Sequence, residues 1–183
     1  PGAPLAKAVR AAFEGGTPSV LILGNHGLVV AAEAISALRA LLDEVEERLA
    51  ARPAPDGAAK IKKSPPPAGY RWADGSPADF LAFDEERLAI AAKGSLYPDH
   101  VVFLGPALTV LRDAGSVSTM IPPPKAAIVK GVGVLARADL TRGALAMLDC
   151  LGLVLARLDP EAPVNYLSTD DEAALLGWDA EAY

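Results

Sequence analysis

Apolar and polar residues alternate along the chain in blocks, and the period of each block predicts a helix or a strand. Apolar residues recur at helical spacing in five segments, which are residues 1–14, 34–52, 76–93, 140–158 and 169–176. Short, continuously apolar or β-branched runs predict strands at 19–23, 28–31, 101–104, 126–130 and 132–136. Residues 107–112 fit either a strand or a helical turn. Strands that alternate with helices predict an α/β fold in layers.

Proline and glycine divide this pattern into two parts. Residues 53–75 carry five prolines and three glycines, which predicts a linker between a part at 1–52 and a second α/β subdomain at 76–183. Ser76-Pro77 is a typical helix start, and Thr169 followed by Glu172 suggests a capping box. The chain begins with Pro1, inside its first predicted helix, so we expect further sequence upstream.

Composition and charge narrow the classes of function. With 51% hydrophobic and 22% charged residues among 183, the chain has a globular composition. Its net charge of −6 argues against nucleic-acid binding, which needs clustered basic residues. The basic cluster of Lys60, Lys62 and Lys63 lies beside prolines and is interpreted as solvated linker.

The single cysteine and the hydropathy pattern bear on the compartment. Cys150 is the only cysteine, so no intrachain disulfide is possible and a reducing, cytoplasmic location is expected. It lies in the apolar run ALAMLDCLGLVLARL, where a thiol acts as a small hydrophobe rather than a nucleophile. No apolar run is as long as the roughly 18 residues that a membrane span needs, so no membrane association is expected.

The segment VLILGNHGLVVAAE, residues 20–33, carries the most informative polar residues. His26 lies between two apolar runs, flanked by Asn25 and Gly27. One interpretation is a simple turn between two strands. The other is a metal ligand, with zinc the obvious ion, because an imidazole at the end of a strand has a fixed direction. Asn25 would then orient the ring or complete the turn, and Gly27 would let the chain turn away.

Two other sites are weaker candidates. His100 in YPDHVVFLGP is either a structural histidine at the start of a strand or a further metal ligand. The GxG in KGVGVL, residues 130–135, resembles a phosphate-binding turn, but more strand sequence follows it and a third glycine is absent. A nucleotide site there is therefore a minor hypothesis, and the residues alone identify no catalytic side chain.

The strand, Asn-His-Gly, strand and long helix of residues 20–52 resemble the class II aldolase/adducin family. The segments SLYPDHVVFLGP, PPPKAAIVKGVGVLARAD and YLSTDDEAALLGWDAEAY are similar to the region after the aldolase domain in bifunctional rhamnulose-phosphate aldolase/lactaldehyde dehydrogenase proteins. The resemblance implies a class II aldolase-like fold, of which this chain is the C-terminal half. It also implies that His26 is the last of three histidine ligands to zinc.

The same resemblance implies a function. Such enzymes are lyases that cleave or form a carbon–carbon bond in a sugar phosphate or related hydroxy-carbonyl substrate, often as homo-oligomers. Their His-x-His pair, catalytic Glu and phosphate-binding residues come earlier in the chain and have no counterpart here, so we expect no lyase activity from this chain alone. The adducin branch of the family implies an alternative, a non-catalytic module for binding or oligomerisation.

Overall fold

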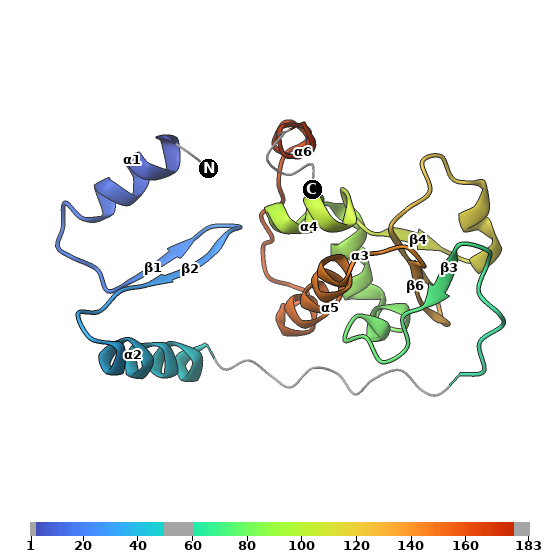
Figure 1. The fold of residues 1–183 in the computed structure, drawn as a ribbon, viewed down its shortest axis with the longest axis horizontal. Helices are drawn as coiled ribbons and strands as arrows, with labels where there is room; N and C mark the ends of the chain where they lie inside the picture. Colours follow the sequence, from blue (N-terminus) through green and yellow to red (C-terminus); the bar gives the residue numbers. More distant parts are fainter. Residues whose placement is uncertain (1–2, 50–60, 178–183) are drawn as a thin grey trace. The chain divides into compact units, whose positions relative to one another are not determined.

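The computed structural model describes residues 3–49 and 61–177, and the chain divides into two compact units, Pro1–Ala51 and Arg52–Tyr183 (Figure 1). Both units mix helices with strands, as the sequence pattern predicts. The first part of the segment expected to be a linker, residues 53–60 with Lys60, lies outside the described residues.

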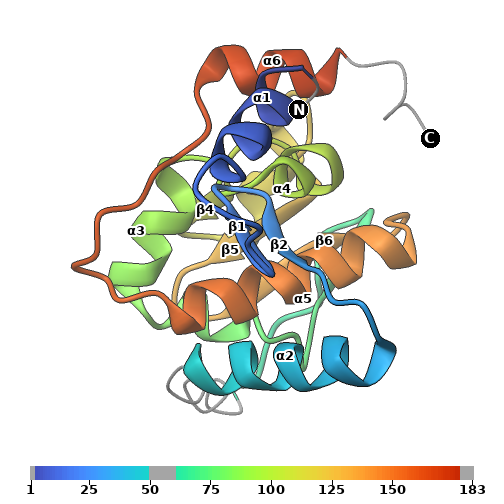
Figure 2. The ribbon, with the colours of Figure 1, turned by 90° about the vertical axis from the view of Figure 1, so that its left-hand side faces the viewer.

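Unit 1 consists of a hairpin and two helices. Helix α1 (Ala3–Ala12) is followed by strands β1 (Val20–Leu23) and β2 (Gly27–Val30) and by helix α2 (Ile35–Arg48). The strands pair antiparallel with Leu23 opposite Gly27, and the two helices lie on either side of the hairpin (Figure 2). No described residue of this unit is buried, and Ile22 and Ile35 are 73% and 74% exposed.

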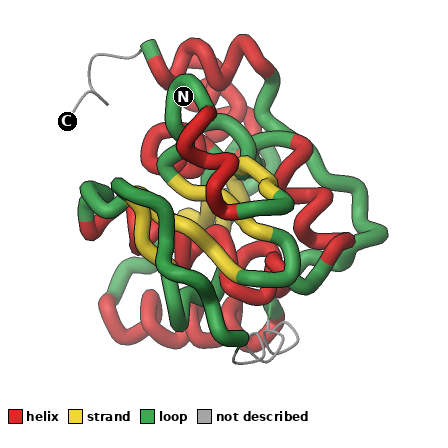
Figure 3. Tube along the Cα trace, turned by 90° about the vertical axis from the view of Figure 1, so that its right-hand side faces the viewer, coloured by secondary structure: helices red, strands yellow, loops and turns green. Residues whose placement is uncertain are grey.

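Unit 2 is built on a four-stranded mixed sheet. Its strands are β3 (Tyr70–Trp72), β4 (Thr109–Leu111), β5 (Ala126–Val129) and β6 (Gly133–Arg137), in the order β3-β6-β5-β4. Only β4 and β5 are parallel; the other pairs are antiparallel. In Figure 3 strands are yellow, helices red and loops green.

Side chains from the two central strands point alternately to the two faces of this sheet. Ile128 and Val134 belong to the larger hydrophobic cluster, whereas Val129 and Leu135 belong to the smaller one on the other face. Because both faces are covered, β5 and β6 have the continuous apolar sequence that is typical of fully buried strands.

Six helical segments complete the described part of unit 2. They are η1 (Asp79–Ala82), α3 (Glu85–Lys93), α4 (Pro98–Leu104), η2 (Ala114–Thr119), α5 (Arg142–Arg157) and α6 (Thr169–Leu176). α5 contributes Leu148, Leu151 and Leu155 to the larger cluster. A Cβ atom at Gly152 would lie 2.4 Å from the backbone nitrogen of Ala78, so α5 can pack against the 76–78 turn only because residue 152 has no side chain.

Four expectations about local structure need correction. Residues 98–104 form helix α4, not a strand at 101–104, because Pro98 stands at the first helical position, where its fixed φ favours a helix. The predicted helix 76–93 is split into η1 and α3 at Asp84, whose carboxylate accepts from the Arg87 backbone N–H at 2.9 Å. The cap of α6 is Ser168 with Asp171, one residue before the predicted pair. Strand β3 lies inside the segment that we expected to be a linker.

Candidate functional site

The Asn-His-Gly segment forms the tip of the β1–β2 hairpin in unit 1. The His26 backbone N–H donates to the carbonyl of Leu23 at 3.0 Å, closing the turn. Asn25 adopts φ 55°, which asparagine tolerates better than most residues, and Gly27 adopts φ 143°, which strongly favours glycine. The predicted turn between two strands is therefore confirmed, and these residue types are explained by its backbone.

The His26 side chain is exposed at this tip. Its imidazole makes no hydrogen bond to another described residue. The turn therefore presents a nucleophilic nitrogen on a short hairpin with a fixed backbone. One imidazole fits one position in a zinc coordination shell, but a zinc site in proteins needs three or four ligands. Within residues 3–49 and 61–177, no three His, Cys, Asp or Glu side chains are grouped to hold a metal.

His100 has a different environment, in α4 of unit 2. Its side chain is fully buried, and its Nδ1 accepts from the Leu96 backbone N–H at 3.4 Å. That bond places the proton of the neutral ring on Nε2, which is buried and has no partner in the described part of the chain. Burial lowers the pKa of His100 to about 4, and the Glu172 carboxylate opposes this shift. These contacts fit the structural interpretation of His100, although in a helix rather than at a strand start.

Tyr97 lies beside this histidine, and Cys150 lies beside Tyr97. The rings of Tyr97 and His100 have centroids 5.9 Å apart and are tilted by 53°. Burial raises the pKa of the Tyr97 phenol, and the neighbouring Cys150 thiol adds to the rise. Cys150 is half-buried on α5, so its environment is less enclosed than the apolar run around it predicts.

The GxG segment forms a hairpin turn between β5 and β6. The Gly131 N–H donates to the Ala82 carbonyl at 2.7 Å, so this N–H is not available to a phosphate. Residue 133 begins β6, and no helix follows the turn directly. Gly133 adopts φ 153°, which strongly favours glycine and accounts for the second glycine by its backbone conformation.

Lys63 is the clearest feature that the sequence did not reveal. Its ammonium binds Asp74 at 2.6 Å and lies 3.7 Å from Asp79 and 5.3 Å from the centroid of the Trp72 ring. The interpretation of Lys63 as solvated linker is therefore wrong, while Lys62 is exposed as expected. Both carboxylates and the aromatic ring come from a segment 9–16 residues downstream of this lysine, and no motif links the four residues.

No family model, curated protein or solved structure matches this chain. The family resemblance of the Asn-His-Gly segment thus stays a prediction from the residues. Among the helices that the structure describes, none combines the length and the apolar character that crossing a membrane requires.

Proposed function

We propose that unit 1 is part of a metal-dependent, class II aldolase-like carbon–carbon lyase, in which His26 supplies one ligand to a zinc ion or another divalent metal. The substrate class is a sugar phosphate or a related hydroxy-carbonyl compound. The observation that carries this proposal is the exposed imidazole of His26 at the tip of a hairpin whose turn backbone is fixed by Asn25 and Gly27.

Among the described residues, this proposal assigns one metal ligand, His26. The chain has only one other histidine, His100, and that ring is fully buried in unit 2. In this proposal the remaining ligands come from residues other than those described. When bound, the metal would polarise a carbonyl oxygen and stabilise an enediolate. The part that unit 1 itself would contribute is positional, since its hairpin holds the imidazole at a defined place.

The uncovered apolar side chains of unit 1 support a role inside a larger assembly. Ile22, Ile35 and Leu49 are 73%, 74% and 61% exposed, which is costly for an isolated two-stranded hairpin with two helices. The same observation favours the second candidate function, an adducin-like module that binds a protein partner or a second copy without catalysis. The two candidates differ in whether His26 contacts a metal.

Metal analysis of the native protein separates them. We expect His26→Ala to reduce bound metal at least about tenfold, because a three-histidine site loses most of its affinity with one ligand. Ser36→Ala, also in unit 1, is the matched control and should keep the metal. Metal content that is unchanged by His26→Ala would contradict the ligand assignment and favour the binding module.

Calorimetric titration of the 183-residue chain with zinc provides the second test. One imidazole without partners should bind zinc only weakly, so no tight stoichiometric step is expected. Tight one-to-one binding would show that the chain supplies more ligands than His26. His100 and the carboxylates near it would then be the residues to replace next.

A further inference from the structure

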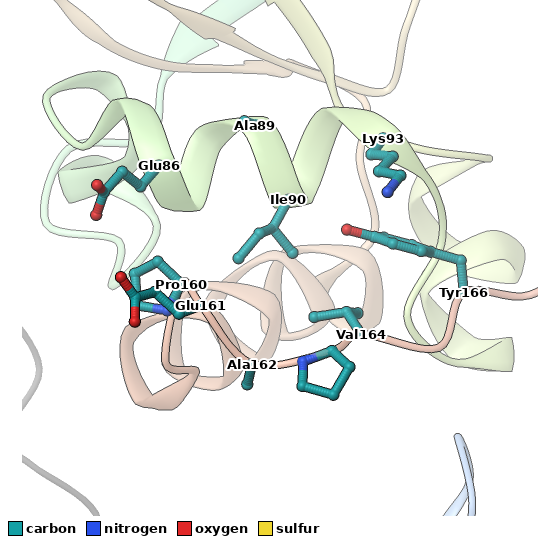
Figure 4. Close-up of a pocket in the computed structure, with 10 residues that line it drawn as sticks. Glu86, Ala89, Ile90, Lys93, Pro160, Glu161, Ala162, Val164 and Tyr166 are labelled. Carbon is teal, nitrogen blue, oxygen red and sulfur yellow. The ribbon is translucent and has the colours of Figure 1, made fainter.

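A groove in unit 2 runs along α3, between this helix and the segment 160–166 (Figure 4). Its volume is about 530 Å³, within the range of small-ligand sites. Ile90 and Val164 line its middle, and polar side chains line both ends. The groove shares no residue with the His26 hairpin, so its role is independent of the function proposed above.

The walls of this groove are fixed by packing. Ile90 is part of the larger hydrophobic cluster, and Val164 and Tyr166 pack against it. A Cβ at residue 94 would lie 2.9 Å from Cδ1 of Tyr166, so the aromatic ring lies directly on Gly94. The Leu167 N–H donates to the Ser95 carbonyl at 2.9 Å and ties the segment 160–166 to the end of α3. A ligand would thus meet a preformed site and lose less free energy to ordering it.

The two ends of the groove carry opposite charge. Glu86 and Glu161 present carboxylates at one end, and neither has an ion-pair partner in the described part of the chain. At the other end the Lys93 ammonium lies 5.3 Å from the centroid of the Tyr166 ring, and the Tyr166 hydroxyl points toward the middle of the groove. A complementary ligand has a cation at one end, an apolar centre and an anion at the other.

The spacing of these ends sets the length of the ligand. Glu86 and Lys93 are seven residues apart on one helix, which corresponds to about 10 Å at about 1.5 Å per residue. An extended chain covers this distance with about three residues, at about 3.4 Å each. A peptide also offers backbone groups to the Tyr166 hydroxyl, and a central apolar side chain to Ile90 and Val164.

We propose that this groove binds a short extended peptide of about three residues with free termini. Its ammonium lies between Glu86 and Glu161, and its carboxylate faces Lys93. The central side chain packs on Ile90 and Val164. The charged side chains at both ends of the groove make it selective for peptides with charged termini over neutral apolar molecules of the same size.

Titration of the isotope-labelled 183-residue chain with Ala-Leu-Ala, followed by NMR, tests this proposal. We expect saturable shifts of the amide signals of Ile90, Lys93 and Val164. N-acetylation or C-terminal amidation of the peptide should each weaken binding about two- to fivefold, the size of one exposed ion pair. Glu161→Gln and Lys93→Gln should weaken binding by a similar factor, and the variant lacking a charge should no longer respond to the corresponding cap.

Glu85→Gln and Lys130→Gln are the matched controls, because both side chains are on the surface of unit 2 but outside the groove. They should bind the peptide as the parent chain does. All four substitutions are at exposed positions, and unchanged spectra elsewhere would show that the fold is kept. Absence of saturable shifts, or binding that ignores both caps and both groove substitutions, would overturn the proposal.

Discussion

The two units use similar elements, yet among the residues that the structure describes only those of unit 2 enclose a hydrophobic core. In unit 2, helices and a sheet bury Leu81, Ile128 and Leu151 completely. In unit 1, two amphipathic helices and a hairpin leave every described side chain at least partly exposed. A two-stranded hairpin has little surface on which helices can pack. Helical periodicity therefore predicts that a helix forms, but it does not identify the surface that covers the apolar face.

The two histidines show the same contrast. His26 is exposed at a hairpin tip, and His100 is buried in α4 with one nitrogen bound to the backbone. An exposed imidazole can bind a ligand, whereas a buried one contributes to stability and its dependence on pH. The environment of each histidine thus determines its role, which is ligand binding for an exposed ring and stability for a buried one.

Truncating a leucine in each unit should give the largest difference. Leu151→Ala removes a fully buried side chain and should lower the free energy of unfolding of unit 2 by about 3 kcal/mol. Leu42→Ala, at a position that is 39% exposed, should cost less than about 1 kcal/mol. Urea unfolding monitored by tryptophan fluorescence measures the first cost, because both tryptophans, Trp72 and Trp178, belong to unit 2. Helix content by circular dichroism measures the second. Equal costs would show that the apolar face of α2 is covered.

Replacing one glycine in each unit by alanine compares the two units by adding a Cβ atom instead of removing a side chain. Gly152→Ala would place a Cβ 2.4 Å from the Ala78 nitrogen. The gain in helix propensity of about 1 kcal/mol should be outweighed by this backbone clash, with a net loss of about 2 kcal/mol. Gly15→Ala, where no atom lies within 4 Å of the added Cβ, should leave stability nearly unchanged. Thermal unfolding of both variants tests this, and a stabilised Gly152→Ala chain would contradict the packing of α5 on the 76–78 turn.

The stability of unit 2 should fall in mild acid because of His100. Its pKa is about 4 in the folded protein and about 6.5 when unfolded, so the unfolded chain binds the proton first as the pH falls. Stability is therefore greatest above pH 6.5 and decreases as the pH falls toward 4, by about 2 kcal/mol between pH 7 and 5. The difference between the unfolding free energies at these two pH values should shrink in His100→Gln. A difference that stays unchanged in His100→Gln would contradict the assignment of this pH dependence to His100.

Periodicity and turn residues were sufficient for much of this fold. The helices at 3–12, 35–48 and 142–157 and the strands of both hairpins lie where apolar spacing predicts them. The tip of the first hairpin follows from Gly24, Asn25 and Gly27, whose residue types suit a turn. These features depend on neighbours in sequence, which is why a single sequence reveals them.

Features that depend on distant residues were missed. Val101 and Val102 suggested a strand, but residues 98–104 form helix α4, which packs against α5 and α6 from much later in the chain. Strand β3 exists because Tyr70–Trp72 pairs with residues 135–137, more than sixty positions away. The same holds for the candidate sites, since His26 could be selected from its local motif, but the groove along α3 joins segments some seventy residues apart.

The smallest expected changes in stability come from neutralising one carboxylate in each unit, Asp79 in unit 2 and Glu44 in unit 1. The Asp79 side chain accepts from the Val134 and Gly75 backbone N–H groups at 3.3 and 3.2 Å and lies 3.7 Å from Lys63 Nζ. Asp79→Asn keeps one acceptor oxygen but removes the charge, and should cost about 1 kcal/mol. Glu44→Gln removes an exposed ion pair with Arg48 on α2 and should lower the free energy of unfolding by at most about 0.5 kcal/mol. Urea titrations at low and high salt distinguish them, because salt screens the exposed pair more than the enclosed one. A larger loss of stability for Glu44→Gln than for Asp79→Asn would contradict this comparison and show that the exposed ion pair contributes more than the enclosed carboxylate.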